Sequence, residues 1–176
     1  ALGYNVHGID IDPNRFSSTI SKLNLRVSKC NIETEALPLE TGSCDMVIFN
    51  ELFEHLRINP IFTIGEVRRV LRSNGMLLLS TPNLRSLKGL ANFLLRNKAY
   101  SNSGDIYHEY QKLERLGHMG HVREYTTAEV SEFLSRLGFH VQTLVFRGRY
   151  KKKGQQLAAR VLPRLRPFVT YIARAQ

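Results

Sequence analysis

Short apolar runs alternate with amphipathic stretches along the chain, and this alternation predicts the fold. Residues 61–72 and 126–137 repeat apolar side chains every three or four positions, as one face of a helix does. Strands that alternate with helices of this length form βαβ units around a mostly parallel sheet. The runs expected as strands cover residues 4–11, 25–28, 45–50, 76–80, 139–146 and 168–173.

Cap and turn residues refine the helix boundaries. Asp12-Pro13 predicts a helix directly after the first strand, because Asp accepts hydrogen bonds from free N–H groups and Pro fits the first turn. The run Thr-Thr-Ala-Glu at residues 126–129 has the capping-box pattern and predicts the start of the late helix. Asn74-Gly75 predicts the end of the preceding helix.

The chain is expected to form one domain over residues 1–176. Residues 84–121 are interpreted as a variable insertion or lid, and residues 147–167 as a basic segment before the last strand. The last two strands have a short connection, which favours antiparallel pairing. The predicted fold class is therefore α/β, a doubly wound, mostly parallel sheet with one antiparallel edge strand.

The net charge of +10 is concentrated at the C-terminal end. From Arg147 onward there are nine Lys or Arg and no acid, so the first 146 residues hold 16 basic and 15 acidic side chains. A uniformly basic nucleic-acid-binding fold is therefore not indicated. The basic segment is open to three partners, namely nucleic acid, an anionic membrane or an acidic substrate, or it is only a solvated surface.

Other features favour a cytoplasmic protein. No apolar run approaches the roughly 20 residues that span a bilayer, and the first residues lack the basic and apolar regions of a signal peptide. Cys30 and Cys44 form no CxxC motif. Reduced cysteines are the simpler interpretation, although one disulfide remains open.

Polar residues stand where the predicted strands end, which is where doubly wound folds bind ligands. Asp10 ends the first strand, and a carboxylate there can accept both hydroxyls of a ribose. In nucleotide-binding folds this acid follows a glycine loop by about 20 residues. Counting back from Asp10 passes residue 1, so we expect the first strand and helix to be missing. The alternative is that Asp10 is a simple turn residue.

Several motifs in order resemble the class I S-adenosylmethionine-dependent methyltransferases. They are Gly-Ile-Asp-Ile-Asp-Pro at 8–13, the stretch from Cys-Asn-Ile-Glu to Asn-Glu-Leu-Phe-Glu-His-Leu at 30–56, Gly-Met-Leu-Leu-Leu-Ser-Thr-Pro-Asn at 75–83 and His-Val-Arg-Glu-Tyr-Thr at 121–126. The likeness is closest to the small-molecule branch that includes the ubiquinone-biosynthesis type and enzymes of glycan and natural-product clusters. It covers nearly all of residues 1–146 and implies a Rossmann-like fold with S-adenosylmethionine as cofactor.

The resemblance also implies a role for each matching position. The motif that holds the methionine part of the cofactor is missing, so the sequence is either a fragment or a protein that does not bind the cofactor normally. The implied cofactor-binding residues are Asp10 for the ribose, Ile11 and Ile32 against the adenine, Asn31 for its amino group, and Asn50 with Glu51 at the methyl-transfer site. The family usually has Asp where this chain has Asn31, which removes a charge from that contact.

Two histidines are the candidate catalytic residues. Methyl transfer to oxygen benefits from a general base, which is most often His. His55 closes the motif near the cofactor, and His121 precedes the late helix. The alternative for each is a capping or surface histidine. The spacing of His118 and His121 is compatible with a metal, but no third ligand is evident, so no metal is predicted.

Residues 84–95 form an amphipathic, basic segment with two interpretations. Its leucines and Phe93 either pack on the domain, or form a lid or membrane-facing helix over a lipid-linked substrate. In the second case Lys88 and Arg96 would face anionic headgroups, giving peripheral membrane contact through residues 84–96.

The predicted function is S-adenosylmethionine-dependent O-methylation of a small molecule or saccharide. One alternative is an RNA methyltransferase, suggested by the basic C-terminal segment. It is disfavoured because Asn50 is followed by Glu-Leu-Phe and not by the Pro-Pro-Tyr of base-amine methylation, and nucleic acid is therefore not an expected partner. The other alternative is a catalytically inactive, truncated fragment that acts as a binding module.

Overall fold

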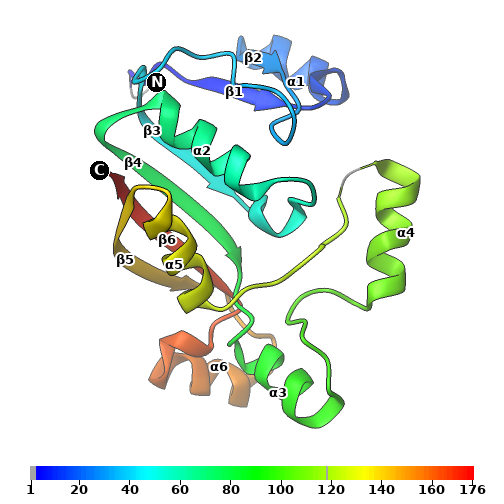
Figure 1. Ribbon diagram of the computed structural model, residues 1–176. Helices are drawn as coiled ribbons and strands as arrows, with labels where there is room; N and C mark the ends of the chain where they lie inside the picture. Colours follow the sequence, from blue (N-terminus) through cyan, green and yellow to red (C-terminus); the bar gives the residue numbers. More distant parts are fainter. Residues whose placement is uncertain (1–2, 118) are drawn as a thin grey trace.

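The computed structural model describes residues 3–117 and 119–176, and its strands form two sheets (Figure 1). The smaller sheet pairs β1 (His7–Asp10) in parallel with β2 (Arg26–Lys29), and α1 (Ser17–Leu23) connects them. The larger sheet has the order β3 (Cys44–Asn50), β4 (Leu71–Pro82), β6 (Phe168–Ala175) and β5 (Phe139–Arg147). No hydrogen-bond ladder joins the two sheets in the described parts of the chain.

The strand β6 runs against both of its neighbours. It pairs antiparallel with β4 and with β5, whereas β3 and β4 are parallel. The predicted antiparallel pairing of the last two strands is therefore confirmed. β5 lies outside β6, so β5 forms the edge of the sheet and β6 is next to it.

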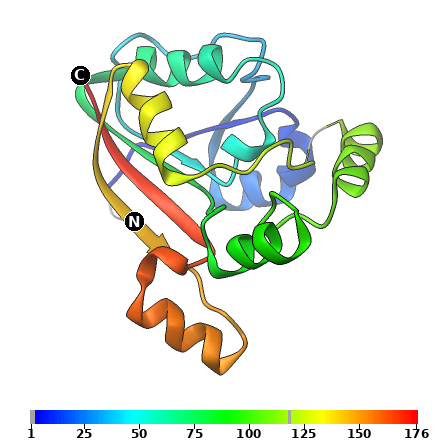
Figure 2. The same ribbon diagram turned by 60° about the horizontal axis from the view of Figure 1, so that its bottom comes forward.

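Two helices cover one face of the larger sheet (Figures 1 and 2). α2 (Pro60–Val70) and α5 (Thr127–Arg136) contribute buried apolar side chains to the same core as β4 and β6. The opposite face is open at β3, where Met46 is 46% and Ile48 is 64% exposed. Although the run at 45–50 is apolar throughout, only one face of β3 meets the core.

Most predicted boundaries are close to the observed ones, and two cap assignments need correction. The Thr126–Glu129 capping box is present at the start of α5. Asp12 precedes the short 3-10 helix η1 (Pro13–Phe16) but makes no side-chain cap. α2 ends at Val70, because Leu71 is already extended and begins β4, so Asn74-Gly75 is a turn within that strand and not the helix stop.

The insertion at 84–121 contains two helices, α3 (Leu87–Arg96) and α4 (Ile106–Leu116). It leaves after β4 and returns beside its own starting point, where Asn83 and Tyr125 form a bridge and Leu84 N donates to the Tyr125 carbonyl at 3.2 Å. Both helices stand off from the sheets (Figures 1 and 2). The sequence pattern predicted neither α4 nor α6 (Lys153–Val161), which lies between β5 and β6.

Two expectations about the chain as a whole can be compared with the structure. No helix in residues 3–117 or 119–176 is long and apolar enough to cross a membrane. Cys30 and Cys44 are both free thiols, as the simpler interpretation expected.

Candidate functional site

The carboxyl end of β3 turns sharply at Glu51. This residue has a positive φ of 49°, and its N–H donates to the Ser80 carbonyl at the end of β4 at 2.9 Å. Arg147 donates to the Glu51 carboxylate at 2.7 Å. Burial raises the pKa of Glu51, and the nearby Arg147 opposes that effect. The turn leads into the 3-10 helix η2 (Phe53–His55), which carries the next polar side chains.

Glu54, on η2, is a carboxyl group inside the protein, with a residue exposure of 1%. Thr81 Oγ1 donates to its Oε2 at 3.0 Å. Its backbone carbonyl accepts from Val122 N at 2.9 Å and from Arg123 N at 3.4 Å. Burial raises the pKa of Glu54 to about 7, and the neighbouring Glu51 adds to the effect. These bonds fix the returning end of the insertion against the ends of β3 and β4.

The two predicted histidines come together although they are far apart in sequence. The rings of His55 and His121 meet edge to face, with centroids 4.7 Å apart. His55 Nδ1 lies 3.0 Å from the Gly120 carbonyl, so this nitrogen carries the proton and Nε2 is the basic one. Burial lowers the pKa of His55.

A hydroxyl and a carboxylate orient His121. Ser103 Oγ is 3.0 Å from His121 Nδ1 and donates to Glu124 Oε1 at 2.9 Å, so it accepts the His121 proton. His121 Nδ1 is 3.7 Å from Glu124 Oε1, and this carboxylate raises the pKa of His121. The His121 N–H donates to Glu109 Oε2 at 2.9 Å. His121 is therefore held by ring and backbone, with Nε2 as its free basic nitrogen.

Glu124 is the most strongly held anion of the site, since its side chain has no exposed surface. Its carboxylate accepts N–H bonds from three consecutive residues, Ser101, Asn102 and Ser103, and hydroxyl bonds from both serines. Burial alone would raise the pKa of Glu124, but the bonds from His121 and Ser101 outweigh it and lower the pKa to about 2. Glu124 is thus a permanent negative charge beneath His121.

The predicted ribose and adenine residues lie at the end of the smaller sheet. Asp10 Oδ1 accepts from Asp12 N at 2.7 Å and lies 3.4 Å from Arg15 Nη2. Asn31 is the second residue after β2, and the intervening Cys30 donates its N–H to the Asp10 carbonyl at 3.0 Å. The Asp10 side chain is 31% exposed, so a ligand can reach it.

The other predicted cofactor residues differ in their accessibility. Asn31 Oδ1 accepts a hydrogen bond from Glu33 N at 3.2 Å, so the amino group of an adenine would compete with Glu33 N for this oxygen. Ile32 packs against the core, and its carbonyl accepts from Thr63 Oγ1 at 3.0 Å. Ile11 is half-buried beside Asp10, and Asn50 is exposed at the end of β3.

The predicted residues thus form two groups. Asp10, Ile11, Asn31 and Ile32 belong to the end of the smaller sheet, whereas Asn50, Glu51, His55 and His121 belong to the end of β3 and the insertion. Sequence reasoning missed Glu54, Thr81, Ser103, Glu124 and Arg147. The signal for Glu54 and Glu124 was present, because both stand within the quoted motifs next to or near a candidate histidine.

Among the described residues, one group of three side chains could hold a metal ion. Glu54, His55 and His121 each offer one ligand atom, and these atoms lie within 4.8 Å of one another. The structure does not bear on the spacing of His118 and His121, for which no metal was predicted, because His118 lies outside the described residues. The pKa shifts described above also suit these three groups for proton transfer without a metal.

A cavity of about 690 Å³ opens beside the cluster on the side of the insertion. Val122 and Glu124 lie on the segment that carries His121, and they form part of its wall. The cavity is bounded further by Leu84, Tyr100, Tyr107 and Arg123. Its mixed apolar and polar lining is typical of sites for small organic ligands.

Part of the chain matches a known protein family. Residues 1–79 match the family model described as a methyltransferase domain. The first 79 of the 176 residues therefore resemble a methyltransferase domain, and they include Asp10, Asn31 and Asn50. Comparison of the chain with curated protein sequences finds no match.

Solved structures similar to this chain share its fold across nearly its whole length. A SAM dependent methyltransferase from Archaeoglobus fulgidus is 15% identical, with a TM-score of 0.63 over 98% of this chain and 76% of that one. One from Aquifex aeolicus is 17% identical, with a TM-score of 0.61 over 98% and 69%. One from Mesorhizobium loti is 14% identical, with a TM-score of 0.63 over 96% and 79%. At these identities the structures show the fold alone.

Proposed function

We propose that this chain is an S-adenosylmethionine-dependent methyltransferase domain that transfers a methyl group to a hydroxyl oxygen of a small molecule or saccharide. The observation that carries the proposal is the chain of contacts from Glu124 through Ser103 to His121, which presents Nε2 beside His55 at the end of β3. An imidazole held in one tautomer by a buried carboxylate is an arrangement that accepts a proton from a hydroxyl.

The donor set at the strand ends fits S-adenosylmethionine. When bound, this cofactor supplies a methyl group on a positively charged sulfur, which needs no further activation. Asp10 would hold the ribose hydroxyls, Asn31 the adenine, and Asn50 with Glu51 would line the methyl-transfer site. The ion pair between Glu51 and Arg147 fixes the Glu51 side chain in that position.

His121 is the proposed base, and His55 supports it. The acceptor hydroxyl would give its proton to His121 Nε2 as its oxygen forms the new bond to the methyl carbon, and the carbon–sulfur bond of the cofactor would break with its electron pair left on sulfur. The resulting positive charge on His121 is stabilised by Glu124, which is fully buried and ionised. Because the pKa of His55 is lowered, its neighbouring ring stays neutral and does not repel that charge.

The cavity supports a small-molecule acceptor. Its volume of about 690 Å³ is in the range of pockets that hold drug-sized ligands. Tyr100 and Tyr107 offer flat apolar surfaces to a ring, while Arg123 and Glu129 offer polar contacts. A sugar or a phenol uses both kinds of contact, stacking on an aromatic side chain and hydrogen bonding through its hydroxyls.

The test measures methyl transfer to a panel of phenols and saccharides with labelled S-adenosylmethionine, and locates the methyl group by mass spectrometry. We expect an O-methyl product, and a loss of at least about tenfold in kcat for His121→Ala. His140→Ala is the control, because His140 lies in β5 and has no role in the site. A methyl group found on nitrogen or carbon would overturn the proposal, and so would full activity of His121→Ala.

A binding experiment separates an enzyme from a binding module. Calorimetry with S-adenosylmethionine is expected to give heat for the wild-type chain and much less for Asp10→Ala. Heat in both, at equal affinity, would remove Asp10 from the site. Absence of heat in the wild type at high cofactor concentration would overturn the proposal and support the alternative of a catalytically inactive chain.

A further inference from the structure

The helix α6 exposes apolar side chains that the protein does not cover. Ala159 faces inward and is 1% exposed, whereas Leu157 is 62%, Val161 72% and Leu162 58% exposed. Leu157 and Val161 are four residues apart and therefore lie on the same side of the helix. Lys153 and Arg160 flank this apolar stripe and are exposed as well.

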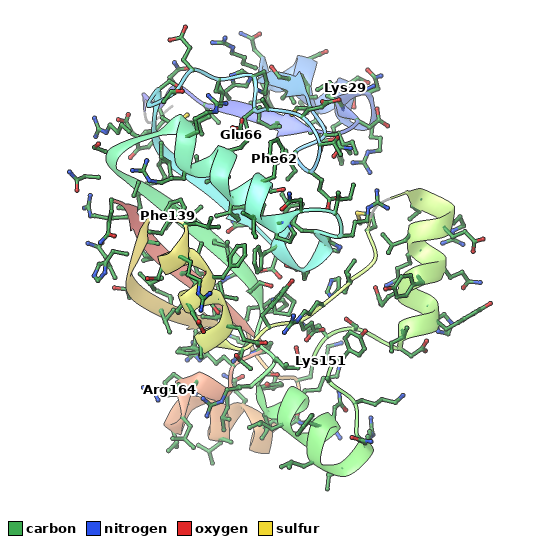
Figure 3. The ribbon with its side chains drawn as sticks, in the orientation of Figure 1. Lys29, Phe62, Glu66, Phe139, Lys151 and Arg164 are labelled. Carbon is green, nitrogen blue, oxygen red and sulfur yellow. The ribbon has the colours of Figure 1, made fainter. Side chains whose placement is uncertain are left out.

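The segment around α6 carries positive charge only. Residues 147–167 contain eight Lys or Arg and no Asp or Glu: Arg147, Arg149, Lys151, Lys152, Lys153, Arg160, Arg164 and Arg166. Arg147 pairs with Glu51. Within the described residues, Lys151, Lys152, Lys153 and Arg160 form no ion pair. Lys151 and Arg164 lie at the end of the molecule that carries α6 (Figure 3).

A second helix at the same end repeats these features. α3 ends in three exposed apolar residues, with Phe93 58%, Leu94 76% and Leu95 82% exposed. α3 and α6 both lie at the end of the molecule far from β1 and β2 (Figure 1). The start of the insertion is tied to the segment after α6, because Asn83 Nδ2 donates to the carbonyls of Arg164 and Arg166, each at 2.9 Å.

We propose that α3 and α6 together bind the surface of an anionic lipid bilayer. The apolar side chains of both helices would enter the boundary between headgroups and acyl chains, and the lysines and arginines around them would meet the phosphates. This surface goes beyond the proposed methyl transfer and does not depend on it.

The combination of side chains favours a bilayer over other anionic partners. Nucleic acid would explain the lysines but not the exposed Leu157, Val161 and Leu94, because phosphate contacts need no apolar stripe. A cavity beside α6 belongs to the same basic segment, residues 147–167. Its lining is polar and includes Arg149, Tyr150 and Arg166, so it is not an apolar groove for a partner helix. Apolar side chains that project from two helix surfaces suit a deformable, apolar partner.

The position of α3 links this surface to the cavity. Leu84 precedes α3 and Lys98 follows it, and both line the cavity of about 690 Å³. A protein seated on a bilayer through α3 would therefore open its cavity close to the headgroups. An acceptor anchored in the same bilayer could enter without leaving it.

The first experiment measures sedimentation of the whole chain with vesicles. We expect binding to phosphatidylcholine vesicles that contain phosphatidylglycerol, little binding to phosphatidylcholine alone, and weakening as salt is raised. The triple variant Lys151→Glu, Lys152→Glu, Lys153→Glu should weaken binding at least about tenfold. Lys22→Glu is the control, because Lys22 is exposed on α1 at the other end of the molecule. Equal binding by both variants would overturn the proposal.

The second experiment reports insertion directly, because the chain contains no tryptophan. Leu157→Trp and Leu94→Trp should each shift their fluorescence to the blue on addition of anionic vesicles, and Leu23→Trp on α1 should not. These exposed sites accept a larger side chain, and thermal unfolding checks that each variant is folded. Binding to the vesicles without a blue shift would show adsorption to the headgroups by charge alone and would refute insertion. The assays use neither cofactor nor acceptor, so a failure of methyl transfer leaves their result unaffected.

Discussion

At the scale of single residues, the site depends on one buried anion. Glu124 accepts five hydrogen bonds from Ser101, Asn102 and Ser103. The Ser103 hydroxyl, which donates to Glu124, also accepts the proton of His121 Nδ1. Because the ring proton is held on Nδ1, Nε2 remains available to an acceptor. Glu124 is therefore a positioning residue that acts through His121.

Replacement of Glu124 by Gln tests this role. Gln keeps the shape but removes the charge, so the pKa of His121 should fall toward its ordinary value, and the acidic limb of the kcat profile should move to lower pH. We expect kcat to fall at least about tenfold, because the cation formed on His121 loses its partner. The measurement is kcat against pH, with Glu132→Gln on the exposed side of α5 as the control. An unmoved pH profile would mean that Glu124 only supports the loop.

The raised pKa of Glu54 predicts a dependence of stability on pH. The pKa of Glu54 is about 7 in the folded protein and about 4.3 in an unfolded chain, so the folded state holds the proton more tightly. Its contribution to stability is complete below pH ~4.3 and is lost as pH rises through 7. The loss is of the order of 3 kcal/mol, and Glu51 and His121 titrate nearby and modify it.

Glu54→Gln should remove most of this dependence. The amide cannot ionise, and its oxygen still accepts the bond from Thr81 Oγ1. Denaturant unfolding at pH 5 and at pH 8 measures the effect. We expect the wild type to lose stability between these values and the variant to lose much less. If both lose the same amount, other groups are responsible.

At the scale of elements, α4 and the returning segment of the insertion fit closely at Gly120. A Cβ on Gly120 would lie 2.3 Å from the Glu109 carbonyl and 2.6 Å from Leu113 Cγ. The Gly120 carbonyl also accepts the proton of His55 Nδ1. Glycine at this position therefore allows the returning segment to pack closely on α4, while its carbonyl contacts His55 on η2.

Gly120→Ala should disturb both the packing and the site. Overpacking of this kind costs about 1–3 kcal/mol, and displacement of the carbonyl would release His55. Gly104→Ala is the matched control, because its Cβ meets nothing within 4 Å. Thermal unfolding and kcat measure the two effects. Equal behaviour of the two variants would show that α4 moves freely to make room.

The same elements show what the sequence predicted and what it did not. The apolar runs predicted each of the strands β1–β6, and residues 126–129 predicted the start of α5, because both signals are local. α4 was missed because Ile106, Tyr107 and Tyr110 are exposed, so the usual buried stripe is weak. The partnership of Glu124 with residues 101–103 is a contact across the insertion, and no local pattern encodes it. The histidines were found as candidates, but their meeting required the folded chain.

At the scale of the whole molecule, the two sheets are unequal in stability. The described part of β1, η1 and α1 buries no side chain fully, whereas β6 buries alternate residues along its length. Segments with few buried contacts open most easily. The smaller sheet, with Asp10 and Asn31, should therefore exchange its amide protons fast in the free protein.

Ligand binding should slow that exchange, because a molecule held by Asp10 and by Asn50 would join the two sheets. We expect S-adenosylhomocysteine to protect the amides of residues 7–29, while β6 stays protected with or without it. Hydrogen exchange followed by mass spectrometry measures this, and Asp10→Ala should abolish the added protection. If the ligand binds and residues 7–29 exchange as before, it occupies a place away from the smaller sheet. In that case the end of β3 alone holds the nucleoside. Asp10 then serves only in the turn, where its Oδ1 accepts a hydrogen bond from Asp12 N.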